Sequence, residues 1–325
     1  MFTGRILRDY LGSDAEASIL VVCKQAMSAP LVFDRSLVRR YRRRAAALGP
    51  ATFLIDRVAE DFTERLSAIL RRFALVADLG SPTGAVRRAL ANQANVGTVI
   101  AVDAQPRDPV SDAALMVVAD EEVLPFAESM FDLVVSALAL QSVNDLPGVL
   151  IQVRRALKPD GLFLGCLLGG DTLTELRQSF AAAEADVEGG VSPHVAPFAD
   201  VRDLGALLQR AGFALPVTDV DRLTVRYASP FALMQDLRRM GACNALTERR
   251  RVPMRRATLM RMTEIYAREF ADADGKVRAT FDIVWLSGWS PHASQQQPLR
   301  PGSARTRLAD ALGSEELSAG EKAGR

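Results

Sequence analysis

Short apolar runs that end beside an acidic residue recur along the first half of the chain. The first three of these runs carry Asp78, Asp103 and Asp120 at their carboxyl ends. A continuous aliphatic run of this length is typical of a strand that is buried on both faces of a parallel sheet. Together with later runs of the same kind, the pattern predicts strands over residues 75–79, 98–102, 115–119, 131–136, 162–168, 217–225 and 279–289.

Stretches with helical spacing lie before and between these strands. Apolar residues recur at helical spacing over residues 53–73, and the helix predicted over 146–157 is followed by the turn sequence KPDG at 158–161. Two more helices are expected over 230–240 and 255–270. This alternation predicts an α/β fold: a Rossmann-like seven-stranded sheet that is mostly parallel, with one antiparallel strand near its end and helices on both faces.

The composition divides the chain into four expected parts. Residues 1–29 are expected to be a disordered N-terminal extension, 30–72 a helical lead-in, 73–290 the α/β domain, and 291–325 a disordered tail rich in Ser, Gln, Pro, Gly and Ala. Met27 opens a segment that is more typical of a protein start than the residues before it. An upstream extension and a misassigned start codon are both open interpretations.

Length, charge and cysteine content exclude several classes. The chain has 325 residues, of which 49% are hydrophobic, enough for a full core. A net charge of +1 gives no general attraction to nucleic acid or membranes. Neither a run of about 18 apolar residues nor a signal-peptide core occurs, so we expect a cytoplasmic bacterial protein; peripheral attachment to the inner membrane through a partner is the alternative. Cys23, Cys166 and Cys243 form no CxxC pair, and the only histidines are His194 and His292, so neither a disulfide framework nor a metal site is indicated.

A strongly basic helix is predicted over residues 35–48 of the lead-in. A cluster of this kind is usually a solvated helix face, and contact with a partner or an anionic surface is the alternative. The clustered residues are Arg39, Arg40, Arg42, Arg43 and Arg44.

The three strand-end aspartates carry most of the chemical information. Ligands of parallel sheets bind beyond the carboxyl ends of the strands, so three carboxylates on successive strands converge on one crevice. Asp103 lies where a carboxylate accepts from ribose hydroxyls, and Asp120 where one accepts from an adenine amine. A ligand with an amino group, ribose hydroxyls and an adenine amine fits this set, and we infer S-adenosylmethionine. Each acid alone is compatible with a helix cap, but three in order are much harder to explain in that way.

The first strand is followed by a turn with Gly80 and Gly84, where the backbone can approach a ligand closely. A plain tight turn would explain this pair equally well, and Pro82 stands where a nucleotide-binding turn usually has a further glycine. A nicotinamide dehydrogenase is disfavoured because the GxGxxG spacing is absent and Asp120 would have no role. A flavin or P-loop protein is disfavoured because no GKS or GKT occurs.

Several longer motifs resemble a known family. DLGSPTG, VIAVDAQ, LPFAESMFDLVVSALALQSVNDLP and LKPDGLFLG resemble the class I S-adenosylmethionine-dependent methyltransferases, and among them the group of malonyl-acyl-carrier-protein O-methyltransferase. The resemblance covers about residues 30–300. GGDTL and SPH–APF are specific to a narrower group, that of the methyltransferase-like mitochondrial complex I assembly factor and its bacterial relatives. The segments similar to that group are GGDTLTELR (169–177), EGGVSPHVAPF (188–198), DLGALLQRAGF (203–213), LMQDLRRMG (233–241) and ATFDIVWLSGW (279–289).

The resemblance implies a set of cofactor contacts. Asp78 would lie near the methionine amino group, and Ser136 would close the site at the end of the fourth strand. Pro82 departs from the family pattern, since a proline has no N–H donor and its φ is fixed at about −65°. The expected cofactor-binding residues are Asp78, Gly80 and Gly84 in the cofactor loop, Asp103 on the ribose, Asp120 and Glu121 flanking the adenine, and Ser136.

Asp171 and His194 are the candidate catalytic residues. Asp171 follows a glycine pair at the end of the fifth strand, and the alternative role is an N-cap of the next helix. His194 lies in a proline-bracketed loop, and the alternative role is a hydrogen bond that fixes this loop.

Together, these patterns favour S-adenosylmethionine-dependent methyl transfer to a protein or an acyl-carrier-linked acceptor. Methyl transfer to a nucleophilic acceptor needs little acid–base help, so the lack of a catalytic dyad does not exclude it. Two alternatives stay open: an arginine hydroxylase-like assembly factor whose partner is a subunit of respiratory complex I, and a non-catalytic assembly factor, which Pro82 motivates. No nucleic-acid partner and no transmembrane segment are expected.

Overall fold

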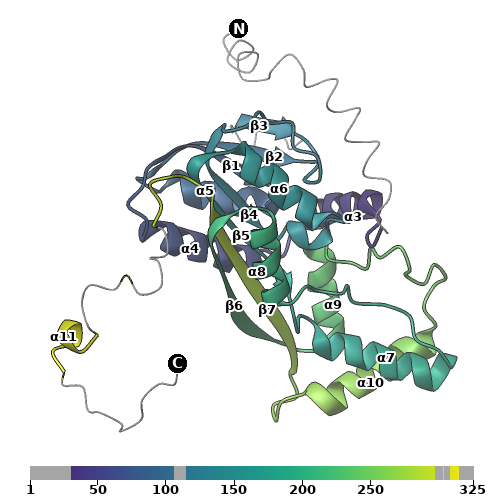
Figure 1. The fold of residues 1–325 in the computed structure, drawn as a ribbon. Helices are drawn as coiled ribbons and strands as arrows, with labels where there is room; N and C mark the ends of the chain where they lie inside the picture. The colour runs from purple at the N-terminus through teal and green to yellow at the C-terminus, as the bar shows by residue number, and fades with distance from the viewer. Residues whose placement is uncertain (1–30, 106–114, 297–302, 304–307, 315–325) are drawn as a thin grey trace. The chain divides into compact units, whose positions relative to one another are not determined.

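A single seven-stranded sheet organises the protein. The computed structural model describes residues 31–105, 115–296, 303 and 308–314. The strand order is β3-β2-β1-β4-β5-β7-β6, and every neighbouring pair is parallel except β5–β7 and β6–β7 (Figure 1). The predicted sheet with one antiparallel strand, β7, is therefore confirmed. The strands are β1 (Phe73–Leu79), β2 (Val96–Asp103), β3 (Leu115–Val118), β4 (Phe131–Ala137), β5 (Leu157–Gly169), β6 (Ala214–Tyr227) and β7 (Val277–Trp289).

Helices cover both faces of this sheet, as the sequence predicts. On β7, Ile283 and Trp285 belong to the core layer that includes α4 and α5, whereas Val284 and Leu286 belong to the layer that includes α6 and α8. Because successive strand residues point to opposite faces and both faces are buried at the centre of the sheet, β1, β4 and β5 have largely apolar sequences. The helices are α3 (Arg35–Leu48), α4 (Phe53–Ser67), α5 (Ala85–Ala91), α6 (Leu146–Ala156), α7 (Thr174–Glu188), α8 (Val201–Arg210), α9 (Pro230–Arg239) and α10 (Arg256–Phe270).

The helix expected to run up to Phe73 ends earlier. Helix α4 stops at Ser67, and Phe73 opens β1. The side-chain amide of Asn95 donates to the backbone oxygens of Leu66 and Ile69 at 3.2 and 3.1 Å, and so satisfies carbonyls that the end of the helix leaves open. This long-range cap is invisible to helical periodicity.

The turn expected at residues 158–161 is an irregular entry into β5. Leu157 pairs with Phe131, and Leu162 pairs with Leu133, so six residues of β5 lie opposite three of β4. A bulge of this kind lets the chain change direction without leaving the sheet. The proline and glycine of the motif therefore shape the start of the strand.

The described residues fall into two units that are divided after Pro291. The first unit contains the sheet, and the second, which starts at His292, contains the short helix α11 (Leu308–Leu312). The extension expected over residues 1–29 and much of the expected tail lie outside the described residues. Among the described residues, no helix is long and apolar enough to cross a membrane.

Candidate functional site

The three strand-end aspartates stand side by side at one edge of the sheet. Strands β1, β2 and β3 are adjacent and parallel, and Asp78 pairs with Ala101 while Asp103 pairs with Val118. Asp120 follows two residues after β3. Asp78 is buried, and the Asp103 carboxylate accepts a hydrogen bond from the backbone N–H of Gln105 at 3.0 Å. The sequence thus places its candidate acids correctly along the carboxyl edge.

The turn after β1 has the tight geometry that its glycines suggest. Gly80 has a φ of 69°, and a 3₁₀ turn, Pro82–Gly84, leads into α5. A Cβ atom at Gly80 would lie 2.8 Å from Oε1 of Glu121 and 3.0 Å from the Cβ of Ala139. Only glycine fits both this backbone conformation and this close approach. The turn is therefore a cradle that another group approaches closely.

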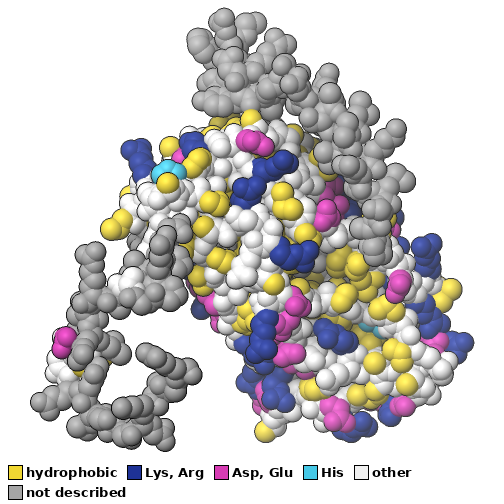
Figure 2. Space-filling view, viewed as in Figure 1, with side chains coloured by type: hydrophobic (Ala, Val, Ile, Leu, Met, Phe, Trp, Pro, Cys, Tyr) yellow, Lys and Arg dark blue, Asp and Glu magenta, His cyan; other side chains and the backbone are white. Residues whose placement is uncertain are grey.

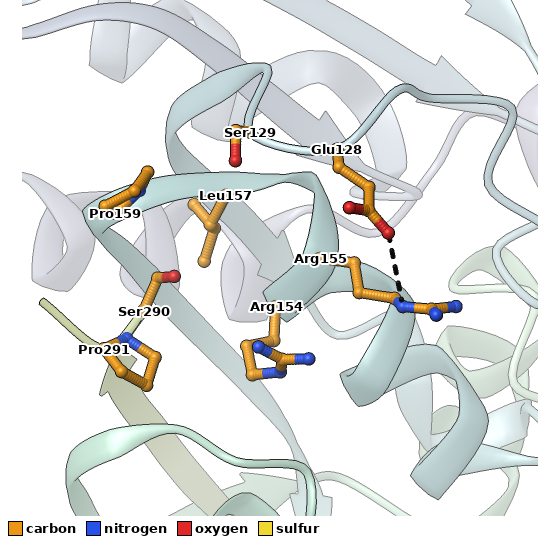
Figure 3. A pocket seen from close by; sticks show the side chains of 8 residues that line it. All are labelled: Glu128, Ser129, Arg154, Arg155, Leu157, Pro159, Ser290 and Pro291. Atoms are coloured by element: carbon orange, nitrogen blue, oxygen red, sulfur yellow. Dashed lines mark ion pairs between the residues drawn. The ribbon is translucent and has the colours of Figure 1, made fainter.

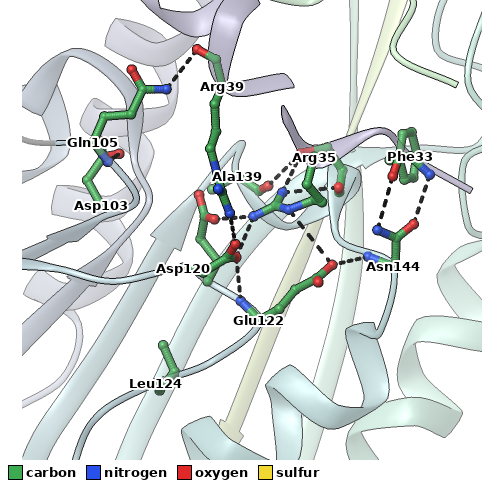
Figure 4. Close-up of polar contacts among 12 residues, drawn as sticks. Phe33, Arg35, Arg39, Asp103, Gln105, Asp120, Glu122, Leu124, Ala139 and Asn144 are labelled. Carbon is green, nitrogen blue, oxygen red and sulfur yellow. Dashed lines mark hydrogen bonds and ion pairs between the residues drawn. The ribbon is translucent and has the colours of Figure 1, made fainter. Parts of the chain in front are cut away.

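One face of α3 is bonded to the acidic segment that follows β3. Arg35 donates to Asp120 Oδ1 at 2.8 Å and also to Glu121, Arg39 donates to Asp120, and Arg42 donates to Glu121 Oε1 at 2.6 Å. Figure 4 shows Arg35 and Arg39 reaching from the helix towards Asp120. Two of the expected adenine-side residues are therefore bonded to arginines of the lead-in.

These bonds divide the basic cluster of the helix into two sets. Arg40, Arg43 and Arg44 are exposed, as a solvated face requires, whereas Arg39 and Arg42 are half-buried against the acids. The sequence interpretation left both roles open and missed Arg35 altogether. Positions 35, 39 and 42 follow the i, i+4, i+7 spacing of one helix face, which is the signal that would have found the set.

The lead-in also makes neutral bonds across the same edge. The side-chain amide of Gln105, just after β2, donates to the backbone oxygen of Arg39 at 2.7 Å. Asn144 exchanges two hydrogen bonds with the backbone of Phe33 (Figure 4). Helix α3 and the residues before it are thus tied to segments that follow β2, β3 and β4.

Asp120 is held ionised by its surroundings. Burial opposes its charge, but the N–H of Glu122 and the guanidinium groups of Arg35 and Arg39 outweigh this and hold the pKa of Asp120 below its ordinary value of 3.8. The carboxylate is therefore an acceptor throughout the neutral range.

Ser136 takes a structural bond. Its side chain is fully buried, and its hydroxyl donates to the backbone oxygen of Leu79 at 2.8 Å, which ties β4 to the end of β1. A second hydroxyl, that of Ser81, accepts from the N–H of Ala137 at 3.0 Å. This hydroxyl therefore braces the strand ends, and the expectation that Ser136 closes the cofactor site stays a prediction.

Asp171 takes part in an ion cluster with residues of β6 and β7. It does not cap α7, whose N-cap is Leu173, and its exposed carboxylate accepts from Arg222 of β6 at 2.6 Å. Arg222 also bonds to Asp282 of β7, which in turn accepts from the N–H of Asp171 at 3.0 Å. In the described residues no hydrogen bond or ion pair joins Asp171 to His194. Asp171 therefore belongs to an ion cluster with Arg222 and Asp282, and its catalytic role stays a prediction.

His194 is fixed from two sides. Its Nε2 lies 2.8 Å from Oε1 of Glu184, and its ring stacks on Phe180 with a centroid distance of 4.1 Å. Glu184 also accepts from the N–H and hydroxyl of Ser192. Burial opposes the charge of Glu184, but the bonds from His194 and Ser192 hold its pKa below the usual range. The loop-fixing role that the sequence left open is therefore present, and Glu184, which carries it, was not singled out by the sequence.

A surface pocket of about 430 Å³ adjoins this histidine. Tyr41 of α3 contributes to its wall. Helix α3 therefore borders both this pocket and the acidic residues that follow β3. Figure 2 shows acidic and basic side chains interspersed over the face that it draws. The lining of this pocket, in contrast, includes three consecutive arginines. Its lining residues are Tyr41, Glu184, His194, Asn244, Arg249, Arg250, Arg251, Val252 and Met254.

A second pocket, of about 440 Å³, lies where β4 and β5 begin and β7 ends (Figure 3). It lies at the edge formed by the amino ends of the parallel strands, whereas the aspartates lie at their carboxyl ends. None of the predicted site residues lines it; its residues are Glu128, Ser129, Arg154, Arg155, Leu157, Pro159, Ser290 and Pro291.

Comparisons with known proteins place this arrangement in a family. A methyltransferase-domain model matches residues 77–165. The chain is 39% identical over 286 residues to the arginine-hydroxylase NDUFAF5, mitochondrial, of Danio rerio, covering 86% of this chain and 89% of the relative. It is 35% identical over 293 residues to the malonyl-[acyl-carrier protein] O-methyltransferase of Laribacter hongkongensis, covering 85% and 96%. The chain belongs to the class I S-adenosylmethionine-dependent methyltransferases.

Further comparisons agree with this family. The human arginine-hydroxylase NDUFAF5, mitochondrial, is 41% identical over 281 residues, with 84% of this chain and 81% of the relative covered. The YcgJ protein of Bacillus subtilis, a solved structure, superposes with a TM-score of 0.50 at 14% identity, covering 72% of this chain and 98% of that one, which supports the fold alone.

The cofactor of class I methyltransferases is S-adenosylmethionine, and the carboxyl edge offers matching chemistry. Acceptors for an amino group, hydroxyls and an adenine amine stand at the ends of β1, β2 and β3. The cradle at Gly80 provides the close backbone approach that a nucleoside ligand requires. In the described arrangement, however, Glu121 lies in this cradle.

Proposed function

We propose that the protein is an enzyme that transfers the methyl group of S-adenosylmethionine to a protein or carrier-linked acceptor. The observation that carries this proposal is the row of aspartates on β1, β2 and β3 beside a positive-φ glycine turn, in a chain of this family. When bound, the cofactor supplies an electrophilic methyl group. The chain's own residues have to orient it, exclude water and position an acceptor.

Each strand end has a separate task in this proposal. The Asp103 carboxylate, which its bond from Gln105 holds in place, accepts from the ribose hydroxyls. Asp78 accepts from the amino group of the methionine part, and Asp120 from the adenine amine. Asp120 is suited to this because its carboxylate is ionised at neutral pH. Positioning of this kind provides much of the rate of a transfer to a nucleophilic acceptor.

The pocket beside α3 is the proposed acceptor site. Its wall carries three arginines and one carboxylate, that of Glu184, which His194 and Ser192 already use. A cationic guanidinium group would meet repulsion and no free carboxylate among the lining residues. An anionic group would meet Arg251, which is exposed. The charge of the pocket therefore favours an acidic or carrier-linked acceptor.

Arginine hydroxylation, within a complex I assembly role, is the second candidate. The identity of 39–41% to relatives named arginine-hydroxylase NDUFAF5 supports it. A non-catalytic assembly factor with the same fold is the third candidate, and the departure at Pro82 is its only support.

Calorimetry with S-adenosylhomocysteine tests the proposed cofactor site. We expect micromolar affinity, roughly 7–8 kcal/mol. Asp103→Ala should weaken binding by about 1–3 kcal/mol, because ribose hydroxyls lose their acceptor. The matched control is Asp171→Ala, an aspartate at the same edge that pairs with Arg222 instead, and its affinity should match that of the wild type.

The outcomes separate the candidates. Absence of binding to the wild-type protein would overturn the methyltransferase proposal and leave the assembly role. If binding is present, mass spectrometry of captured partner proteins distinguishes a methylated carboxylate from a hydroxylated arginine.

A further inference from the structure

Glu121 is a charged residue in an unusual place. Its side chain is fully buried, with 0% exposure, and its carboxylate lies against Gly80 in the turn after β1. The Cβ of Ala139, after β4, borders the same space. This is the cradle in which the backbone is open to a ligand. A carboxylate therefore fills part of the position that the proposed function assigns to the cofactor.

Two arginines of α3 hold the carboxylate there. Arg42 donates to its Oε1 at 2.6 Å, and Arg35 donates to its Oε2. Arg42 also donates to the backbone oxygen of Ala139 at 3.4 Å. A buried charge is stable only when it is paired and hydrogen-bonded, so Glu121 remains in the cradle only while α3 is docked.

The opposite face of α3 is anchored independently. Leu37 and Val38 are buried in a small apolar cluster with Ala245, and the N–H of Asp34 donates to the backbone oxygen of Ala245 at 2.8 Å. The arginine face can therefore lift from the acids while the apolar face stays in contact. Helix α3 therefore has an anchored apolar side and a polar side, which is closed by charge pairs together with the bond from Gln105 to the backbone oxygen of Arg39.

We propose that α3 is a gate on the cofactor site and that the Glu121 carboxylate keeps this gate closed. In the closed arrangement, Arg35 and Arg42 hold Glu121 in the cradle. Cofactor entry requires Glu121 to leave Gly80 and α3 to turn about its apolar side. Since only the open form binds, the apparent affinity is reduced by the fraction of molecules that are open. This inference rests on the proposed cofactor site and concerns access to it.

Removing the Glu121 carboxylate should increase the affinity for the cofactor. We expect Glu121→Ala to bind S-adenosylhomocysteine at least tenfold more tightly than the wild type in calorimetry. Glu121→Gln keeps the shape and loses the charge, and it should give a smaller gain of about two- to fivefold. The matched control is Glu128→Ala, an acid that pairs with Arg155 of α6, and it should bind within about twofold of the wild type.

Hydrogen exchange provides a second readout that does not depend on one variant. Addition of S-adenosylhomocysteine to the wild type should speed amide exchange in α3 between Arg35 and Arg42. In Glu121→Ala, exchange there should already be fast and should change little.

Each outcome decides a different point. Weaker binding by Glu121→Ala would make Glu121 a cofactor ligand and overturn the gate, and so would affinity within twofold of the wild type. Failure of both proteins to bind would overturn the proposed cofactor site itself.

Discussion

Two buried glutamates, one at the cofactor edge and one at the acceptor pocket, are satisfied in opposite ways. Glu121 is bonded to Arg35 and Arg42, which lie 86 and 79 positions away in the sequence. Glu184 is bonded to Ser192 and His194, only 8 and 10 positions away. Both side chains are almost completely buried, with 0% and 2% exposure. The first depends on the docking of a distant helix. The second lies on α7 and is held mainly by the loop that follows this helix, with Arg250 at 4.0 Å.

This difference determines what each glutamate can do. A carboxylate whose partners come from a separate helix can be released when that helix moves, so Glu121 is suited to a gate. A carboxylate whose partners follow within one loop keeps them unless the loop unfolds. Glu184 is therefore suited to hold the ring of His194 in a constant orientation towards the pocket.

The largest effect should come from removing the distant partners. Arg35→Ala with Arg42→Ala leaves Glu121 buried and unpaired, and the free energy of unfolding should fall by about 3–5 kcal/mol. Urea denaturation measures it. The matched control is Arg40→Ala with Arg43→Ala on the exposed face of the same helix, which should stay within about 0.5 kcal/mol of the wild type. A loss below about 1 kcal/mol in the first variant would mean that water reaches Glu121 without unfolding, and the contrast with Glu184 would disappear.

The sequence predicted the centre of the sheet well because the central strands β1, β4 and β5 are buried on both faces. Largely apolar runs such as 131–136 and 162–168 contain this information locally, and the one antiparallel strand was expected near the end. Element ends were less accurate where distant residues decide them. Asn95 ends α4, and the pairing slip between β4 and β5 absorbs the expected turn.

The candidate site was predicted in part for the same reason. Strand ends fix where Asp78, Asp103 and Asp120 stand, so their common edge follows from the topology. The partners of a charged side chain do not follow from it. Nothing local indicates that Asp171 pairs with Arg222, or that Glu121 faces the glycine turn.

An intermediate effect is expected at the locally held pair. In His194, Nε2 is bonded to Glu184, and among the described residues no hydrogen bond is formed to Nδ1, which leaves that nitrogen for an acceptor. His194→Ala should leave the affinity for S-adenosylhomocysteine unchanged. It should reduce modification or capture of the partner by about tenfold, or about 1.4 kcal/mol. His292→Ala, the other histidine, is the control. Equal losses in cofactor affinity and melting temperature would give His194 a purely structural role.

The smallest effect is expected at Pro82, in the turn whose Gly80 borders Glu121. Pro82 opens the 3₁₀ turn, and the next residue, Thr83, has a φ of 63°. Because the backbone turns at Thr83 and Gly84, Pro82→Gly should change cofactor affinity by less than about threefold, roughly 0.6 kcal/mol. It should cost about 0.4–1 kcal/mol of stability through the greater freedom of the unfolded chain. Thr83→Gly is the matched variant, since it relieves a strained φ and keeps the proline. A much larger gain in affinity for Pro82→Gly alone would mean that the proline, and not Glu121, limits access to the cradle, and would favour the non-catalytic assembly role.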